Sequence, residues 1–294
     1  AYEICEGLVG SERCIRASYA GPRVHLIDRA ESDAAHPDER PTTINAAGAR
    51  MLAALGAWDR LETPPAPVTR IAVAEGPTPT GLAARRRPDS DLSWQSGDTP
   101  MGYVVANAAL QSALRETLAA TNVIQRRGCG VTGWSAGNTI SSLGLADAAG
   151  QEETMEAALV VACDGARSMM AELAGLDRRE ERQSQTAIVT TLLAERPHEG
   201  TAFQRFLPTG PFALMPGPGD ADGYEMSLVW TLPNDTARQL IAADNASFEA
   251  ACLEAFGSRL GYLALAGNRL AWPLQPAGRR RITAPGRVLA GDAA

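Results

Sequence analysis

The sequence predicts an α/β fold with two domains, a larger one of parallel strands and helices and a smaller one with an antiparallel or mixed sheet. The 294 residues exceed what one hydrophobic core usually encloses before a chain divides into domains. The continuous apolar run at 159–163 is typical of a parallel strand that is buried on both faces. From about residue 185, strand-like segments alternate with Gly, Pro and Asp turns, which indicates an antiparallel sheet.

In the first half of the chain, strands and helices are expected to alternate. Tyr2–Cys5 and Arg23–Asp28 are strand-like runs separated by one helix length. A helix is expected over 44–55, where apolar residues recur at helical spacing and Gly56 follows as a C-terminal stop. A second helix is expected after Asn107, whose side chain can act as an N-cap by accepting a free backbone N–H. Both helices are expected to pack on a sheet.

In the second half, strands are expected at 185–195, 201–207, 212–215 and 224–232, and a helix at 248–256. Two further strands, ending at 163 and 290, stop at glycine-containing turns and are assigned to the larger domain. The predicted division gives the larger domain residues 1–181, the smaller domain residues 182–271, and the larger domain again residues 272–294.

Composition and charge exclude several classes of protein. Apolar residues make up 45% and charged residues 21%, as is usual for a globular protein. A net charge of -7 disfavours binding to phosphate backbones, so nucleic acid is not expected as a partner. The five cysteines and three histidines lack metal-ligand spacing, so no metal site is expected, and unpaired cysteines fit the cytoplasm. No apolar run approaches the roughly 20 residues of a membrane helix, and no signal-peptide pattern is seen.

A short glycine motif lies between the first expected strand and the helix that follows. Gly7 and Gly10 match the second and third glycines of a dinucleotide-binding fingerprint, whereas Cys5 stands at the first. Such a turn directs backbone N–H groups and the positive end of a helix toward a pyrophosphate. Asp28 ends the second strand, where an acidic residue holds ribose hydroxyls in this fold. The alternative for Asp28 is a turn-capping role at a strand end. The motif predicts a Rossmann-like domain.

Segments along nearly the whole chain also follow the order of one known family. They include Val24-His25-Leu26-Ile27-Asp28-Arg29, Asp164-Gly165-Ala166-Arg167-Ser168 and Gly291-Asp292-Ala293-Ala294, with others at 40–45, 55–59, 102–107, 185–189, 195–198, 204–208, 210–211 and 228–230. Together they resemble the ubiquinone-biosynthesis hydroxylase family of FAD-dependent (class A) flavoprotein aromatic monooxygenases. The resemblance implies an FAD-binding domain with a smaller substrate domain. It also implies an enzyme that uses NAD(P)H and O₂ to hydroxylate an aromatic substrate of the polyprenyl phenol type.

The resemblance assigns cofactor contacts residue by residue. It implies Gly7 and Gly10 at the FAD pyrophosphate, Asp28 at the adenosine ribose with Arg29 beside it, Arg40 at the outer face of the cofactor, Asp164 and Gly165 near FAD and the nicotinamide donor, and Gly291 and Asp292 at the ribityl and pyrophosphate region. A carboxylate accepts hydrogen bonds from sugar hydroxyls, which suits the three acids. Without the family, Asp164 and Asp292 would be interpreted as ordinary turn residues at strand ends. No side chain is assigned as a catalytic acid or base.

The implied substrate is lipophilic, so an apolar pocket is expected, with a peripheral contact to a membrane or to a biosynthetic complex. Aromatic and sulfur-containing side chains of the expected strands are candidates to line that pocket: Phe203, Phe206, Phe212, Met215 and Trp230. The alternative is that they belong to the core. His198 is the one histidine of this region, and a structural role is expected for it.

The chain departs from the family pattern in several places. Ala108 and Ala171 stand where the family usually has Arg, and the helix expected at 11–19 carries more charge than the family's. The family continues past Ala294 into a loop and helix beside the flavin ring, so the chain as given is expected to bind FAD more weakly than a complete member. Two other hypotheses follow, a catalytically degenerate flavoprotein-like subunit that binds partners and a flavin oxidoreductase that does not hydroxylate.

Overall fold

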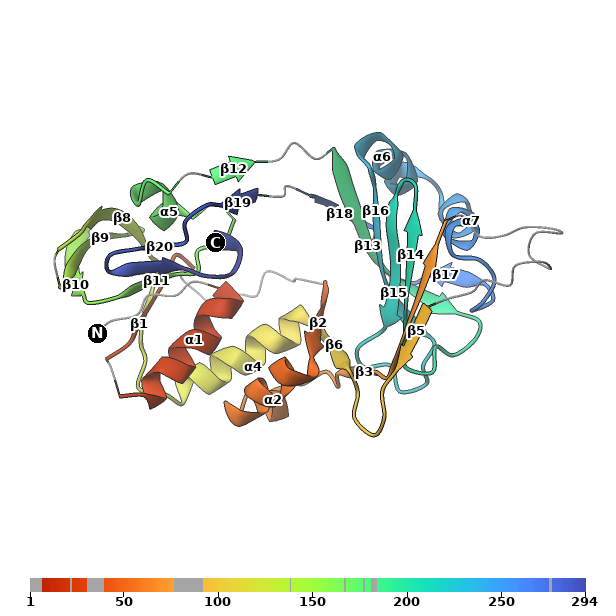
Figure 1. Ribbon diagram of the computed structural model, residues 1–294, viewed down its shortest axis with the longest axis horizontal. Helices are drawn as coiled ribbons and strands as arrows, with labels where there is room; N and C mark the ends of the chain where they lie inside the picture. The colour runs from red at the N-terminus through yellow and green to blue at the C-terminus, as the bar shows by residue number, and fades with distance from the viewer. Residues whose placement is uncertain are drawn as a thin grey trace.

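The computed structural model describes residues 7–21, 23–30, 40–76, 92–137, 139–166, 168–176, 178–180, 184–274 and 277–294. Helices α1, α2 and α4 and several small sheets form one end of the molecule, and a large sheet with helices α6 and α7 forms the other (Figure 1). This confirms the predicted α/β class. The strand expected at Tyr2–Cys5 lies outside the described residues. None of the helices in the described ranges has the length and hydropathy to cross a bilayer.

The helical end of the molecule contains the first predicted strand–helix units. Its elements are α1 (Gly7–Tyr19), β1 (His25–Asp28), β2 (Pro41–Asn45), α2 (Ala46–Ala54), η1 (Trp58–Arg60), β3 (Ala66–Val68), β6 (Gly102–Ala106), α4 (Asn107–Ala119) and β7 (Ile124–Arg127). β1 and β7 pair in parallel, whereas β2, β6 and β3 form an antiparallel sheet. The strand predicted at Arg23–Asp28 is confirmed as β1.

Helix α1 buries the apolar side chains of one face and leaves its arginine side chains exposed. Cys14 and Ile15 are fully buried, whereas Arg13 and Arg16 are exposed. Arg16 lies within 3.3 Å of Glu12, one turn away, as a surface ion pair. The desolvation cost expected for charges on an enclosed helix therefore does not arise.

Two predictions about helix starts need correction. Ile44 belongs to β2, and α2 begins after Asn45, whose Oδ1 accepts the N–H of Gly48 at 2.7 Å as the N-cap. Asn107 is not an N-cap, because it is already the first residue of α4. Its buried side chain instead accepts a hydrogen bond from the Thr42 hydroxyl. Pairing of β2 with β6 brings these two residues together, and a sequence pattern does not reveal that competing partner.

The remaining small sheets lie beside this helical region (Figure 1). Their elements are β8 (Cys129–Ser135), β9 (Ser141–Asp147), β10 (Glu152–Ala157), β11 (Val160–Ala162), α5 (Met169–Leu173), β12 (Arg178–Glu180), β19 (Ala277–Arg279), β20 (Thr283–Ala284), β21 (Arg287–Leu289) and η2 (Gly291–Ala293). β11 and β21 pair in parallel, although they are far apart in sequence, which confirms the parallel strands predicted at these two positions.

The other end of the molecule is an eight-stranded sheet covered by two helices. Its elements are β4 (Arg70–Glu75), β5 (Leu92–Gln95), β13 (Gln185–Ala194), β14 (Thr201–Leu207), β15 (Gly210–Pro216), β16 (Glu225–Pro233), α6 (Asn234–Ala242), α7 (Asn245–Phe256), β17 (Leu263–Leu265) and β18 (Leu270–Pro273). The strands run in the order β17-β13-β16-β15-β14-β4-β5, and β18 also pairs with β13. The four strands and the helix predicted after residue 185 are confirmed, as is their antiparallel pairing.

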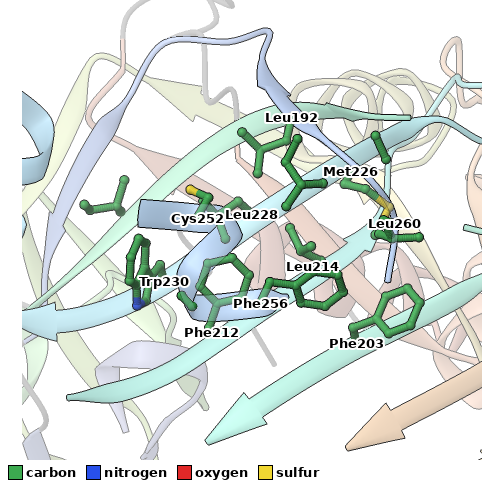
Figure 2. Packing of buried hydrophobic residues seen from close by; sticks show 14 of the residues in the cluster. Leu192, Phe203, Phe212, Leu214, Met226, Leu228, Trp230, Cys252, Phe256 and Leu260 are labelled. Atoms are coloured by element: carbon green, nitrogen blue, oxygen red, sulfur yellow. The ribbon is translucent and has the colours of Figure 1, made fainter. Parts of the chain in front are cut away.

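The largest core cluster lies between this sheet and its helices (Figure 2). Alternate residues of β15 and β16 point into it, among them Phe212, Leu214, Leu228 and Trp230, and Phe256 of α7 packs against them. The rings of Phe212 and Trp230 meet edge to face with centroids 5.0 Å apart. One face of the sheet is therefore committed to packing.

The parallel pairing of β14 with β4 adds a detail that the domain prediction did not contain. β4 and β5 belong to the predicted first segment, 1–181, yet they hydrogen-bond into the sheet of the predicted second segment, 182–271. The division at 181 and 271 stays a prediction, and we propose that residues 70–75 and 92–95 are grouped with the smaller domain.

Candidate functional site

Two predicted motifs, at Asp164-Gly165 and Gly291-Asp292, leave the same edge of one small sheet. β11 and β21 are parallel and in register, with Ala162 opposite Leu289, so each motif begins two residues beyond that pair. The N–H of Ala290 donates to the carbonyl of Ala162 at 2.9 Å, which continues the pairing into the turns. Parallel pairing therefore brings together two pairs of predicted site residues, and the two pairs are more than 120 positions apart in sequence.

The backbone at these turns needs glycine. Gly165 has φ of +79° and Gly291 has φ of +60°, a region that other residues rarely adopt. A Cβ added to Gly165 would meet no atom of the described residues within 4 Å, so the space beside this turn is open in that part of the structure. A backbone that is exposed in this way can approach a ligand closely.

Among the described residues, one carboxylate oxygen of Asp164 accepts a hydrogen bond and the other does not. Its Oδ2 accepts the N–H of Met170 at 3.0 Å, at the start of α5. Its Oδ1 is buried and has no hydrogen-bond partner among the described residues. A buried acceptor without a partner costs free energy, so a ligand hydroxyl at this position would be favourable. Asp292, on the neighbouring turn, is exposed.

Gly7 and Gly10 belong to α1, the helix that packs near this sheet edge. Gly7 is its first residue. The buried residues Cys14 and Ile15 share one core cluster with Val161, which lies in β11. An N-terminal helix end with free N–H groups is an anion site by its dipole and geometry.

Asp28 and Arg29 lie at the carboxyl end of β1. The Oδ1 of Asp28 accepts the N–H of Ala30 at 3.0 Å, which is the turn-capping contact considered above as the alternative. Among the described residues no hydrogen bond to its Oδ2 is found, so this oxygen can accept a further one. The Arg29 side chain runs over the backbone of Gly130 in β8, where an added Cβ would lie 2.8 Å from Nε. β1 pairs with β7, so within the described residues Asp28 is not on a strand adjacent to β11 or β21.

Arg40, directly before β2, makes one side-chain contact and one backbone hydrogen bond with other elements. Its guanidinium lies 3.8 Å from the centroid of the Trp272 ring, in β18 of the large sheet. Its carbonyl accepts the N–H of Asn107 at 3.1 Å. Arg40 therefore lies where the helical end of the molecule meets the eight-stranded sheet.

These features fit the requirements of FAD. Sugar hydroxyls need acceptors, and Asp28, Asp164 and Asp292 are acceptors at strand ends. The orphaned Oδ1 of Asp164 and the open turn at Gly165 are the observations that support the fit most directly. A pyrophosphate needs backbone N–H groups, which a helix start such as that of α1 provides. The residues present can therefore hold the cofactor that the resemblance implies.

A cavity of about 120 Å³ lies between the start of β2 and the face of the large sheet that is opposite to its helix-side core. Its lining comes from both ends of the molecule: Pro41, Ala106, Val189, Thr190, Thr191, Pro218, Glu225, Ser227, Gly267, Asn268 and Leu270. Pro41 follows Arg40 directly, so the cavity adjoins the predicted cofactor contact.

The side chains of β16 that face the cavity are polar. Met226 and Leu228 are fully buried in the helix-side core, so alternation of the strand places Glu225 and Ser227 on the opposite face. Thr191 of β13 lies directly across from Ser227. Sequence analysis did not identify these residues, although polar residues at alternate positions of an otherwise apolar strand were a readable signal.

The aromatic residues proposed as pocket lining behave differently. Phe203, Phe212 and Trp230 belong to the core between the sheet and its helices, which confirms the alternative for these three. Phe206 is exposed. Met215 lies on the cavity side of the sheet, where the Thr43 hydroxyl lies 3.1 Å from its sulfur, but it is not part of the lining.

Burial raises the pKa of Glu225, and the nearby Asp220 carboxylate raises it further. The backbone N–H of Glu225 donates to the Asp220 carboxylate at 2.6 Å, which fixes this end of the strand.

His198 lies on the loop between β13 and β14, where its Nδ1 accepts the N–H of Gly200 at 3.0 Å. That contact is within its own loop, as expected for a structural histidine.

Comparison with known proteins gives one family match over almost all of the chain. The family model described as FAD binding domain matches residues 7–294. Ubiquinone hydroxylase UbiL of Rhodospirillum rubrum is 34% identical over 295 residues, covering 98% of this chain and 64% of that protein. The 3-demethoxyubiquinol 3-hydroxylase of Escherichia coli is 29% identical over 295 residues, covering 98% of this chain and 71% of that protein. The chain thus spans 64% of the length of the first of these relatives.

Solved structures give the same fold. p-Nitrophenol 4-monooxygenase PnpA from Pseudomonas putida superposes with a TM-score of 0.71 at 18% identity, covering 100% of this chain and 72% of that chain. The flavin-dependent monooxygenase PieE, solved with FAD and substrate, gives 0.68 at 16% identity, covering 99% of this chain and 52% of that chain. At these identities the likeness concerns the fold alone.

Proposed function

Because this chain belongs to the FAD binding domain family, we propose that it belongs to an FAD-dependent monooxygenase that hydroxylates an aromatic ring, with NAD(P)H as the electron donor and O₂ as the oxidant. The substrate class we propose is a lipophilic polyprenyl phenol, as in ubiquinone biosynthesis. The names of the two relatives, a ubiquinone hydroxylase and a demethoxyubiquinol hydroxylase, support that class. The observation that carries the proposal is the sheet edge where Asp164-Gly165 and Gly291-Asp292 emerge together.

The residues of this chain would bind and orient the cofactor. Asp164 and Asp292 accept hydrogen bonds from its sugar-like hydroxyls, and Asp28 accepts those of the adenosine ribose. The start of α1, at Gly7, donates N–H groups to the pyrophosphate. Arg40, stacked on Trp272, offers a fixed positive charge at the outer face. When bound, FAD supplies the redox chemistry that activates O₂ with electrons from NAD(P)H.

The cavity between β2 and the large sheet is the proposed site for the substrate ring. It adjoins Arg40, so a ring bound there would lie next to the cofactor. Closing such a site excludes water, which protects the oxygen transfer from side reactions. Because a polyprenyl phenol partitions into lipid, we also propose that the protein contacts the membrane surface peripherally.

Isotope labelling tests the reaction. The purified protein, loaded with FAD, would be given NADPH or NADH, ¹⁸O₂ and a short-chain prenyl phenol, and the product would be analysed by mass spectrometry. We expect one ¹⁸O atom in the product and consumption of the nicotinamide only when the phenol is present. Flavin absorbance after gel filtration measures whether FAD stays bound.

The other two hypotheses give different results in the same experiment. Bound FAD and oxidised nicotinamide without ¹⁸O in the product would indicate a flavin oxidoreductase that does not hydroxylate. A protein that binds no FAD in a titration and oxidises no nicotinamide with FAD in excess would indicate a degenerate subunit. Either result would overturn the proposed reaction.

A further inference from the structure

The cavity-facing side of β16 presents two polar side chains, those of Glu225 and Ser227. Ser227 is only 4% exposed. Thr191 lies opposite it on β13 and Met215 lies opposite it on β15, so neighbouring strands flank it on both sides. Among the described residues the structure gives its hydroxyl no hydrogen-bond partner. Because Ser227 lines the cavity, this hydroxyl can donate a hydrogen bond to a ligand group there.

Glu225 lies two residues before Ser227 and on the same face of the strand. That spacing separates the two Cα atoms by about 6.6 to 6.8 Å, within reach of one bound ligand atom for a long and a short side chain. The Glu225 carboxylate also has no hydrogen-bond or ion-pair partner among the described residues. Its side chain is confined by Gly217, where an added Cβ would lie 2.7 Å from Oε1. The glycine therefore leaves room for this carboxylate beside the cavity.

The size of the cavity limits what can bind there. At about 120 Å³ it is slightly smaller than a cavity of about 150 Å³ that accommodates benzene in another protein. One aromatic ring therefore fills it, and a prenyl chain must extend outward. A wall with a hydroxyl and a carboxylate also favours a ring that carries a group able to accept and donate a hydrogen bond.

We propose that Ser227 and Glu225 select the substrate by its ring hydroxyl, with Ser227 donating a hydrogen bond to the phenolic oxygen and Glu225 accepting the phenolic O–H. This inference rests on the proposed function and assigns specificity to two residues that form part of the cavity. The pair anchors one ring oxygen, which fixes the rotation of the ring within the cavity. Removal of either contact leaves the apolar part of the pocket intact.

A binding experiment with two small probes tests the proposal without turnover. 4-Fluorophenol and 4-fluorotoluene differ in one substituent of similar size, and their dissociation constants with the FAD-loaded protein can be measured by ¹⁹F NMR. We expect the wild-type protein to prefer the phenol. In Ser227→Ala the affinity for 4-fluorophenol should fall about fivefold to tenfold, and in Glu225→Gln by about tenfold. Neither change should alter the affinity for 4-fluorotoluene.

Thr231→Val is the matched control, because Thr231 is buried on the same face of β16 but outside the cavity lining. Its affinities for both probes should equal those of the wild type. An equal loss for both probes in Ser227→Ala would mean that the side chain only packs, and an unchanged preference would mean that it does not contact the ligand. Each result overturns the proposal. Loss of ¹⁸O incorporation with the phenol preference intact would instead count against the proposed reaction.

Discussion

The two ends of the molecule carry their polar candidate residues in different places. At the helical end these residues follow strands, as Asp164 follows β11 and Asp292 follows β21. In the eight-stranded sheet they lie within strands, as Ser227 lies within β16, with a hydrophobic core on the opposite face. The first arrangement uses the backbone of a turn and its glycines, whereas the second uses only the alternation of side chains. We therefore propose that the strand ends hold a ligand through exposed backbone and carboxylates, and that the strand centres select it through their side chains.

Different regions of the molecule should therefore determine stability and binding. The helix side of the large sheet should determine stability, its cavity side should determine ligand preference, and the strand ends at the other end of the molecule should determine cofactor affinity. Four substitutions test these assignments, and they are ordered by the size of the expected effect.

Phe212→Ala should have the largest effect. Phe212 is fully buried, with ring centroids 5.0 Å from Trp230 and 5.9 Å from Phe256, so its loss leaves a cavity in the core. The free energy of unfolding should fall by about 3 to 5 kcal/mol, as measured by chemical denaturation. Phe206→Ala, on the neighbouring strand, is the control, because Phe206 is 51% exposed and its loss should change stability by less than about 0.5 kcal/mol. Equal costs would contradict the division of the sheet into two faces.

Asp28→Ala should weaken FAD binding and leave the fold largely intact. Loss of a charge-assisted hydrogen bond to the ribose should cost ~1.5 to 3 kcal/mol, or about tenfold to a hundredfold in the dissociation constant. Flavin fluorescence titration measures this change. Asp147→Ala is the matched control, because Asp147 also ends a strand and accepts a turn N–H, from Gln151 at 2.8 Å. If both variants bind FAD as the wild type does, Asp28 only caps its turn.

Ala108→Arg should strengthen FAD binding by a smaller amount. Ala108 is exposed in the first turn of α4, so the longer side chain can be accommodated there. Restoring the arginine of the family should add roughly 1 kcal/mol, or about fivefold, less than the loss at Asp28 because an exposed ion contact is screened. Ala108→Gln tests whether the charge is responsible. Equal FAD affinities for the Arg and Gln variants would argue against a role for the charge.

His198→Asn should have the smallest effect, because His198 lies on a loop of the large sheet and its hydrogen bond to Gly200 stays within that loop. Burial lowers the pKa of His198, an effect that the nearby Asp220 carboxylate opposes. The unfolded chain therefore binds the proton more readily, so the contribution of His198 to stability is complete above about pH 6.5 and decreases as the pH falls below it. His198→Asn keeps an acceptor for the N–H of Gly200 and removes the titration.

Denaturation curves at about pH 7 and pH 5 measure this dependence. The loss of stability on acidification should be smaller in His198→Asn than in the wild type, with FAD affinity unchanged. Burial also lowers the pKa of His25, with nearby Arg126 and Arg23 adding to the effect, so part of the dependence should remain in the variant. A steeper dependence in the variant would show that protonated His198 stabilises its loop.

Much of the fold was predictable because it depends on local patterns. Apolar runs that end at residues 163 and 290, each just before a glycine-containing turn, predicted two strands, and the alternation of strand-like segments with turns after residue 185 predicted the antiparallel sheet. Glycine turns also indicated the candidate residues at strand ends, since a backbone with positive φ is nearly restricted to glycine. The assignment of Asn107 as an N-cap was wrong because Thr42, a distant residue, engages its side chain.

By itself, the sequence determined the class of fold, most of the elements and the family, because periodicity, turn residues and ordered motifs are properties of neighbouring positions. Only the tertiary structure decided that β4 and β5 join the large sheet, that Asp164 and Asp292 leave one edge, and that Ser227 faces a cavity. These facts depend on which strands pair and in which register. Pairing buries surface from distant segments at once, so its outcome depends on the whole chain and not on any local pattern.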